Sequence, residues 1–162
     1  SSDMIGIELG GSIKNVIALA AGVSVGLGCG DNTMAALITR GITEIARLGI
    51  AMGGRLETFA GLSGIGDLIV TCTSRHSRNH NAGVLIGKGY TMDEAMKEVK
   101  QVVEGVYSAK AAKKLAEKYQ VSMPIVSEIN EVLFGNLSAK DALANLLTRD
   151  RCEEYPNDPW QQ

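Results

Sequence analysis

The stretch GSIKNVIALAAGVSVG, residues 11–26, decides the fold of this chain. Its apolar side chains recur at helical spacing and lie nearly all round the axis, which is typical of a central helix that other helices surround. They are Ile13, Val16, Ile17, Leu19, Ala20 and Val23. The surrounding apolar run, 16–30, covers only about 15 residues, fewer than the roughly 20 needed to span a bilayer. We therefore predict a buried helix here and no membrane segment.

The composition is that of an ordinary globular domain. Of 162 residues, 45% are hydrophobic and 21% are charged, with 16 basic against 18 acidic side chains. A net charge of -2 and a pI near 5.7 give no electrostatic basis for binding nucleic acid or an anionic membrane. Only 4% of the residues are aromatic while 19 are glycine, which favours close helix packing over aromatic-rich strands.

The cysteines indicate neither a metal site nor a disulfide framework. Cys29, Cys72 and Cys152 stand far apart, with no CxxC motif and no histidine at ligand spacing. An odd count without a signal peptide fits a reducing compartment, so we expect a cytoplasmic protein with no bound metal. The chain also opens without a start methionine, almost directly into an apolar element, which indicates a piece of a longer protein.

Helical signals dominate the rest of the chain, and no segment alternates apolar and polar residues with period two. Beyond the central helix we predict helices over about 31–53, 91–100, 107–119, 124–135 and 138–147. Asp31 or Asn32 is the expected N-cap of the first of these. The apolar piece within 62–73 is compatible with a strand or a buried helix. We predict an all-α bundle with a helical substrate-binding and catalytic domain over 1–150 and a polar tail over 151–162.

Lys14, followed by Asn15, interrupts the start of the most apolar helix. Two glycines one turn earlier, Gly10 and Gly11, would let a ligand approach the backbone. A buried ammonium is costly unless it is paired, and a paired one is a suitable general acid. The alternative is that Lys14 reaches the surface from a helix end and has no catalytic role.

Asp67 follows the glycine-rich bend 61–66 and precedes an apolar run. Its carboxylate can orient the lysine or a substrate hydroxyl, or it can be an ordinary helix N-cap. The bend is not the GxGxxG fingerprint and no strand-turn-helix unit surrounds it. We therefore expect the nucleotide-binding domain to be absent from this chain.

The polar segment 74–81 combines an arginine fork with hydroxyl and amide groups at an expected helix start. Ser77, Arg78 and Asn79, together with free backbone N–H groups, are the usual means of binding a phosphate. The alternative is a solvated polar loop. His76 and His80 show no spacing that would make them metal ligands.

These segments occur in a characteristic order. The sequence runs through Ile7-Glu8-Leu9-Gly10-Gly11, Lys14-Asn15, Gly30-Asp31-Asn32 and then 36–41, 58–62, 64–68, 71–74, 77–79 and 102–105. From about Met4 to Leu147, this pattern resembles the C-terminal, substrate-binding domain of bacterial-type NAD(P)-dependent glycerol-3-phosphate dehydrogenases.

The resemblance implies a compact multi-helix bundle like the C-terminal domain of 6-phosphogluconate dehydrogenase, with an N-terminal Rossmann domain absent from this chain. It implies an oxidoreductase that interconverts sn-glycerol 3-phosphate and dihydroxyacetone phosphate with NAD or NADP, the cofactor being bound mainly by the absent domain. The isolated chain would be inactive. The full-length enzyme would be a homodimer that takes a small-molecule substrate and binds neither nucleic acid nor membrane.

The resemblance also implies roles for individual residues. Lys14 would be the catalytic proton donor and acceptor. The substrate would be bound by Lys14, Asp67, Ser77, Arg78 and Asn79. The cofactor would be contacted by Arg78, Val102 and Glu104, and no metal would be needed because the hydride belongs to the nicotinamide.

Two other readings remain open. The chain can belong to another member of the wider hydroxy-acid dehydrogenase group, whose substrates carry a carboxylate, although the segments 64–68 and 77–79 favour phosphate. Alternatively, it can be a non-catalytic helical module whose apolar, glycine-rich helix is a dimer seam. Lys14 lying far from Asp67 and Arg78 would favour the module. The preference for NAD or NADP stays open, because the deciding residues normally lie on the other domain.

Overall fold

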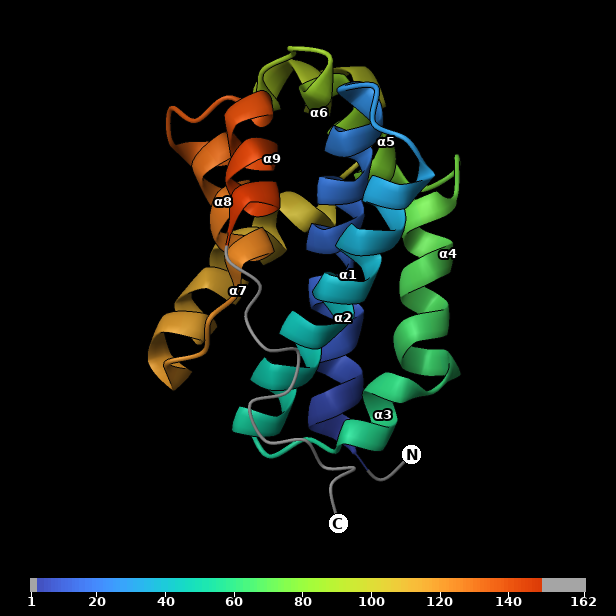
Figure 1. Cartoon of the computed structure of the whole chain (residues 1–162). Helices are drawn as coiled ribbons and strands as arrows, with labels where there is room; N and C mark the ends of the chain where they lie inside the picture. Colours follow the sequence, from blue (N-terminus) through green and yellow to red (C-terminus); the bar gives the residue numbers. More distant parts are fainter. Residues whose placement is uncertain (1–2, 150–162) are drawn as a thin grey trace.

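A computed structural model describes residues 3–149 (Figure 1). Within that range every regular element is a helix, which confirms the all-α prediction. The helices are α1 (Met4–Gly26), α2 (Asp31–Ala51), α3 (Leu56–Ala60), the π-helix η1 (Leu62–Gly66), α4 (Asp67–Thr73), α5 (Arg78–Gly87), α6 (Met92–Val99), α7 (Glu104–Tyr119), α8 (Pro124–Phe134) and α9 (Ala139–Thr148). Cys152 and the tail predicted over 151–162 lie outside the described residues.

Helix α1 forms the centre of the bundle, with α2, α4, α5 and α7 packed around it (Figure 1). From Ile13 to Val23 every residue except Lys14 is buried, as the all-round apolar pattern predicted. The predicted start at Gly11 was wrong, because the helix begins at Met4. The central helix therefore carries Lys14 in its third turn, well inside the element.

Asp3 is the reason for the earlier start of α1. Its carboxylate accepts a hydrogen bond from the N–H of Gly6 (2.9 Å), which caps the helix. The same carboxylate accepts from the N–H of Arg55 (2.9 Å) and from Thr58 Oγ1 (2.6 Å). Hydrogen bonds from Thr58, Arg55 and Gly6 hold the pKa of Asp3 below its ordinary value. Asp3 thus joins the start of α1 to the start of α3.

The prediction of no membrane segment rested on a short apolar run, but α1 has 23 residues. By length and composition alone it could cross a bilayer. However, 61% of its most apolar window is buried inside the bundle, as in the core helix of many globular proteins. Its apolar character is therefore only weak support for a membrane span.

Helices α1 and α5 pack backbone against backbone through facing glycines. A Cβ at Gly22 would lie 2.0 Å from the carbonyl oxygen of His80, and one at Gly83 would lie 2.1 Å from that of Leu19. Gly26 and Gly87 make contacts of the same kind one turn further on. The glycine-rich side of α1, considered above as a seam between two molecules, is used inside this chain to set the position of α5.

We expect Gly83→Ala to destabilise the chain by about 1–3 kcal/mol, since the new methyl group meets a backbone oxygen and not a flexible side chain. Urea unfolding of the two proteins measures the difference. Gly11→Ala, also on α1 but with open space around it, is the control. It should stabilise by about 0.5–1 kcal/mol. Equal midpoints for the two variants would contradict the close α1–α5 packing.

Some predicted helix ends were wrong. Helix α2 has Gly30 as its N-cap, and Asp31 is its first residue. There the carboxylate interacts favourably with the positive end of the helix dipole but does not cap the helix. The segment 62–73, whose sequence is compatible with a strand or a helix, is helical throughout and forms η1 and α4. The helix expected from Tyr107 begins three residues earlier, at Glu104.

Other local signals were confirmed. Thr91 and Glu94 form the predicted capping box of α6. Pro124 occupies the first turn of α8, and Gly135 is the C-cap that follows its last residue, Phe134. Ser138 caps α9, accepting a hydrogen bond from the N–H of Asp141 (3.0 Å).

Glu44 of α2 is a buried carboxylate, 3% exposed, at the start of α8. It accepts hydrogen bonds from the N–H groups of Ile125 (2.8 Å) and Val126 (3.4 Å). Desolvation raises the pKa of Glu44 to about 7, although those two N–H groups and the charges of Arg47 and Arg149 oppose the shift. A group that titrates near neutrality therefore lies between α2 and α8.

Candidate active site

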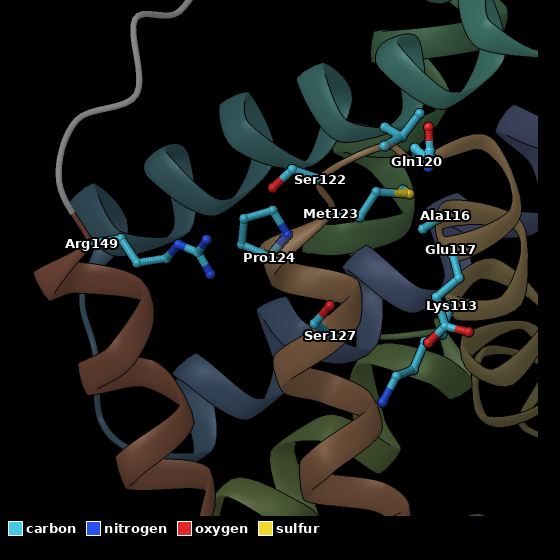
Figure 2. Close-up of a pocket in the computed structure, with 10 residues that line it drawn as sticks. Lys113, Ala116, Glu117, Gln120, Ser122, Met123, Pro124, Ser127 and Arg149 are labelled. Atoms are coloured by element: carbon cyan, nitrogen blue, oxygen red, sulfur yellow. The ribbon is translucent and has the colours of Figure 1, made fainter.

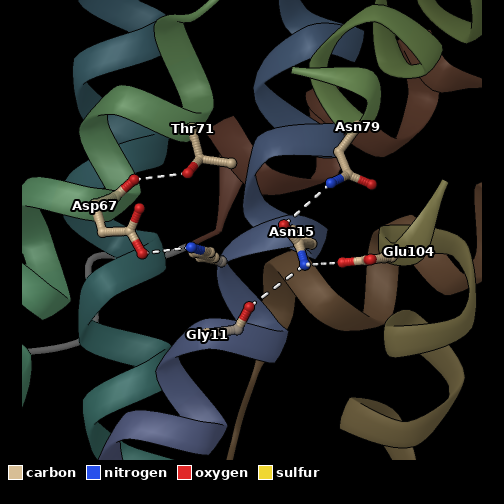
Figure 3. A network of polar contacts seen from close by, with 7 residues as sticks. Gly11, Asn15, Asp67, Thr71, Asn79 and Glu104 are labelled. Carbon is tan, nitrogen blue, oxygen red and sulfur yellow. Dashed lines mark hydrogen bonds and ion pairs between the residues drawn. The ribbon is translucent and has the colours of Figure 1, made fainter. Parts of the chain in front are cut away.

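Lys14 turns toward α4, where its Nζ donates a hydrogen bond to the carboxylate of Asp67 (Figure 3). The side chain of Lys14 is 24% exposed and that of Asp67 41% exposed. The lysine side chain is thus mostly covered and paired, which favours a role in a site over a lysine that simply reaches into solvent. Both side chains remain partly exposed, so a small molecule can reach the pair.

The π-helix η1 leads directly into Asp67. At its centre, Gly64 lies so close to Phe59 that a Cβ there would be 2.2 Å from the Phe59 carbonyl oxygen. Single π-turns of this kind are frequent at functional sites. The N-cap position of α4 belongs to Gly66, so the alternative of Asp67 as an ordinary N-cap was wrong. Asp67 is the first residue of α4, and its carboxylate is directed to Lys14 instead.

Asn15 is the centre of a second set of contacts, on the other side of α1 from the Asp67 pair (Figure 3). Its Nδ2 donates to Glu104 Oε2 (3.3 Å), and its Oδ1 accepts from Asn79 Nδ2 (3.0 Å). Asn79 Oδ1 in turn accepts from the N–H of Gly105 (2.8 Å). No role was assigned to Asn15 from the sequence. The signal that could have indicated one is a side-chain amide in an otherwise apolar helix, next to Lys14.

Arg78 begins α5, and its Nη2 lies 3.9 Å from Glu104 Oε1. At this distance the ion pair is loose, so most of the guanidinium N–H groups remain available. Ser77 caps the helix by accepting from the N–H of His80 (3.2 Å). The segment 74–81 is therefore a capped helix start and not merely a solvated loop.

The structure gives two sets of contacts among the predicted residues, on two sides of α1, and they meet only at the neighbours Lys14 and Asn15. Lys14 and Asp67 form a pair. Arg78 reaches the same turn of α1 through Glu104 and Asn15. We call these six residues the Lys14 cluster: Lys14, Asn15, Asp67, Arg78, Asn79 and Glu104.

The three side chains expected to contact a cofactor, those of Arg78, Val102 and Glu104, are exposed. The side chains of Arg78 and Glu104 are 44% and 59% exposed, and Val102 is 61% exposed. A cation, an apolar surface and a carboxylate near the starts of α5 and α7 are chemically suited to one side of a dinucleotide. Within residues 3–149 no group of three or more His, Cys, Asp or Glu side chains could hold a metal ion.

Two nucleophilic or titratable groups near the cluster are buried. Desolvation raises the pKa of the Cys72 thiol to about 12, so this cysteine is an inert core residue. Burial lowers the pKa of His80, and its Nδ1 finds no hydrogen-bond partner in the described part of the chain. Neither group has the environment of a catalytic nucleophile or base.

A hollow of about 350 Å³ lies elsewhere, between α7, α8 and the end of α9 (Figure 2). Polar and charged side chains such as Lys113, Gln120, Ser122 and Arg149 line it. No member of the Lys14 cluster is among its lining residues. Its volume alone therefore says nothing about the predicted site.

Comparison with protein families gives a match over residues 3–144 to the family described as the C-terminus of NAD-dependent glycerol-3-phosphate dehydrogenase. The chain is similar to glycerol-3-phosphate dehydrogenase (NAD(P)+) of Agathobacter rectalis, with 66% identity over 161 residues, 99% of this chain and 48% of the relative. It is also similar to the Fusobacterium nucleatum protein of the same name, with 62% identity over 151 residues, 93% of this chain and 45% of the relative. The chain thus spans about half the length of these curated relatives.

Solved structures give the same result. The crystal structure of glycerol-3-phosphate dehydrogenase from Coxiella burnetii matches with a TM-score of 0.90 and 44% identity, over 92% of this chain and 46% of that one. A structure described as DsGPDH of Dunaliella salina matches with a TM-score of 0.76 and 26% identity, over 88% of this chain and 29% of that one. The all-α bundle is therefore similar to one part of larger proteins.

Proposed function

Since the chain belongs to the NAD-dependent glycerol-3-phosphate dehydrogenase family, with a C-terminal match over residues 3–144, we propose that it is the substrate-binding half of an enzyme that interconverts sn-glycerol 3-phosphate and dihydroxyacetone phosphate with NAD(P)(H). The contact between Lys14 and Asp67 carries this proposal, because a lysine held in a partly covered ion pair is suited to proton transfer.

Lys14 is the proton donor and acceptor at the substrate oxygen in this proposal. A bound nicotinamide supplies or accepts the hydride. Reduction of the ketone builds negative charge on its oxygen, which an ammonium neutralises by giving up a proton; oxidation of the alcohol needs the reverse transfer. Asp67 holds the lysine in position and is accessible enough to accept a hydrogen bond from a substrate hydroxyl.

The start of α5 is the proposed phosphate site. Arg78 offers a fork of parallel N–H groups, and Ser77 and Asn79 flank it. The positive end of the α5 dipole favours an anion at the same place. The distance of 3.9 Å between Arg78 and Glu104 supports this assignment, because so loose a pair leaves the arginine free to bind a phosphate.

We expect Arg78→Lys in the full-length enzyme to raise the KM for dihydroxyacetone phosphate roughly ten- to a hundredfold. An ammonium replaces two parallel donors by one point charge, a loss on the order of 1.5–3 kcal/mol. At saturating NAD(P)H, so that a weakened cofactor contact of Arg78 does not limit turnover, unphosphorylated dihydroxyacetone should be turned over equally by both proteins. Arg75→Lys, on an exposed arginine of the same segment, serves as the control. An equal loss with both ketones would mean that Arg78 does not bind the phosphate.

The cofactor, NAD or NADP, would contact Arg78, Val102 and Glu104 from this half. Their exposed side chains support the assignment. A nucleotide-binding domain would hold the rest of the cofactor, and residues 3–149 form no strand from which such a domain could be built. The isolated chain should therefore have no dehydrogenase activity.

A full-length enzyme that carries this chain after a nucleotide-binding half tests the proposal. We expect NAD(P)H oxidation with dihydroxyacetone phosphate and none with the isolated chain. Turnover of 2- or 3-hydroxy acids in place of the phosphorylated substrate would assign the chain to the wider hydroxy-acid dehydrogenase group. Absence of turnover with every substrate would favour a non-catalytic helical module.

We also propose that the full-length enzyme is a cytoplasmic homodimer that binds neither nucleic acid nor membrane. The nearly balanced charge, -2, and the burial of α1 support the absence of both partners. Sedimentation of the full-length enzyme would give its oligomeric state, and a monomer would overturn that part of the proposal.

A further inference from the structure

A closed ring of polar contacts joins the first two residues of α7 to α1 and α5. The N–H of Gly105 donates to Asn79 Oδ1 (2.8 Å), and Asn79 Nδ2 donates to Asn15 Oδ1 (3.0 Å). Asn15 Nδ2 then donates to the carboxylate of Glu104 (3.3 Å), the neighbour of Gly105 in sequence. Figure 3 shows Asn15 between Asn79 and Glu104. Three helices are thus held by one set of side chains.

The direction of every hydrogen bond in the ring follows from the two groups that α7 contributes, the N–H of Gly105 and the carboxylate of Glu104. A backbone N–H only donates, so Asn79 must present its carbonyl oxygen to Gly105. An ionised carboxylate only accepts, so Asn15 must present its NH2 to Glu104. The two amides then face each other as donor and acceptor, with no conflict. The N–H of Gly105 and the carboxylate of Glu104 therefore require the same orientation of the Asn15 and Asn79 side-chain amides.

Helix α7 depends on this ring because it has no cap of its own. Its N-cap residue, Val103, carries no hydrogen-bonding side chain, so the orphan N–H of Gly105 needs an acceptor from elsewhere. Asn79 supplies it from α5. The approach is close: a Cβ at Gly105 would lie 2.7 Å from the carbonyl oxygen of Asn15 and 2.9 Å from Asn79 Oδ1.

We propose that Asn79 is a positioning residue that couples the substrate-binding start of α5 to the cofactor-facing segment 102–104, through its hydrogen bond to the N–H of Gly105. This inference rests on the proposed function, and it goes beyond a direct contact between Asn79 and substrate. One N–H of the Asn79 amide is used by Asn15, and Asn79 is only 7% exposed, so a direct contact with substrate would have to use the second N–H alone. The carbonyl oxygen serves α7.

Hydrogen exchange of the 162-residue chain tests the structural part. In Asn79→Ala the Gly105 amide should exchange at least about tenfold faster than in the wild type, because its acceptor is gone. In Asn79→Asp a carboxylate oxygen can still accept from Gly105, although the donor to Asn15 Oδ1 is lost, so the protection of Gly105 should return in part and exceed that of the alanine variant. Unchanged protection of Gly105 in the alanine variant would overturn the inference.

Asn130→Ala is the matched control. Asn130 is also a buried asparagine, and its Nδ2 donates to the carbonyl oxygens of Ala109 and Val126 (2.8 Å each), so it joins α8 to α7 one turn beyond Gly105 through hydrogen bonds that do not involve the ring. Its loss should lower the Tm by an amount similar to the loss of Asn79. The exchange of Gly105 relative to other core amides should nevertheless stay at the wild-type ratio. Faster relative exchange of Gly105 in both variants would reflect general destabilisation and would contradict a specific role of Asn79.

The functional part is tested by the Kd of NAD(P)H for the full-length enzyme without substrate, measured from nicotinamide fluorescence. We expect Asn79→Ala to raise this Kd about tenfold and Asn130→Ala to leave it unchanged. An unchanged Kd in Asn79→Ala, with only the KM for dihydroxyacetone phosphate raised, would reduce Asn79 to a substrate contact and overturn the coupling. If the wild type binds NAD(P)H but reduces no phosphorylated ketone, the proposed substrate is wrong, while the raised Kd still supports the coupling.

Discussion

Replacing Lys14 with alanine in the full-length enzyme is expected to lower kcat by about 10²- to 10⁴-fold, the usual contribution of a general acid–base group. The protein should stay folded, because alanine is favourable in a helix and the carboxylate left behind, Asp67, is 41% exposed and can be hydrated. Turnover of dihydroxyacetone phosphate at saturating substrate measures the loss. Circular dichroism and the Tm check the fold.

Lys113→Ala is the matched control for this experiment. Lys113 forms an ion pair with Glu131 (2.9 Å), and its side chain is 36% exposed, but it belongs to α7 outside the Lys14 cluster. Its loss should leave kcat unchanged. Near-normal turnover of Lys14→Ala would remove Lys14 from the mechanism, and a similar loss in both variants would mean that the effect is not specific to the site.

The stability of the chain should contain a pH-dependent contribution from Glu44 of up to about 3 kcal/mol. The folded protein raises the pKa of this carboxyl from 4.5 to about 7, so between these values the folded state binds a proton that the unfolded state has released. The contribution is therefore fully present below about pH 4.5 and is lost as the pH rises through about 7. Burial of the carboxylate, opposed only in part by the N–H groups of α8, is the cause.

Glu44→Gln isolates this contribution, because the amide oxygen can still accept from Ile125 while the titration is removed. The difference in free energy of unfolding between variant and wild type, measured in urea at pH 5 and pH 8, should shift in favour of the variant at pH 8. Glu94→Gln is the control and should show almost no change between pH 5 and pH 8. Hydrogen bonds from Thr91 lower the pKa of Glu94 from 4.5, so that carboxyl stabilises the folded chain at high pH and loses this effect only as the pH falls below about 4.5. A pH-independent difference for Glu44→Gln would contradict the raised pKa.

Local sequence signals were sufficient for α6, α8 and α9. A capping box at Thr91, a first-turn proline at Pro124 and a glycine stop at Gly135 each involve residues within one turn of one another, so sequence spacing describes them fully. The start of α1 was missed for the opposite reason. Asp3 finds two of its partners, Arg55 and Thr58, 52 and 55 residues along the chain.

For the candidate site, too, the sequence indicated the residues but not their contacts. Lys14, Asp67 and Arg78 could be selected from the sequence because each interrupts an apolar or glycine-rich pattern, and the family resemblance gave each a role. Their pairing could not be read from any pattern. Lys14 meets Asp67 across 53 residues, and only the packing of α4 on α1 determines that their side chains touch.

By itself, the sequence determined an all-α bundle around an apolar central helix, the ends of several helices and the polar residues from which a site could be built. These depend on periodicity, capping and turn chemistry, which act over a few residues. The tertiary structure decided the backbone contact of α1 with α5, the burial of Glu44 beneath α8 and the ring through Asn15 and Asn79. Each of these depends on the position and rotation of one helix relative to another, and a hydrogen bond between residues 64 positions apart forms only when both are set to within a fraction of an ångström.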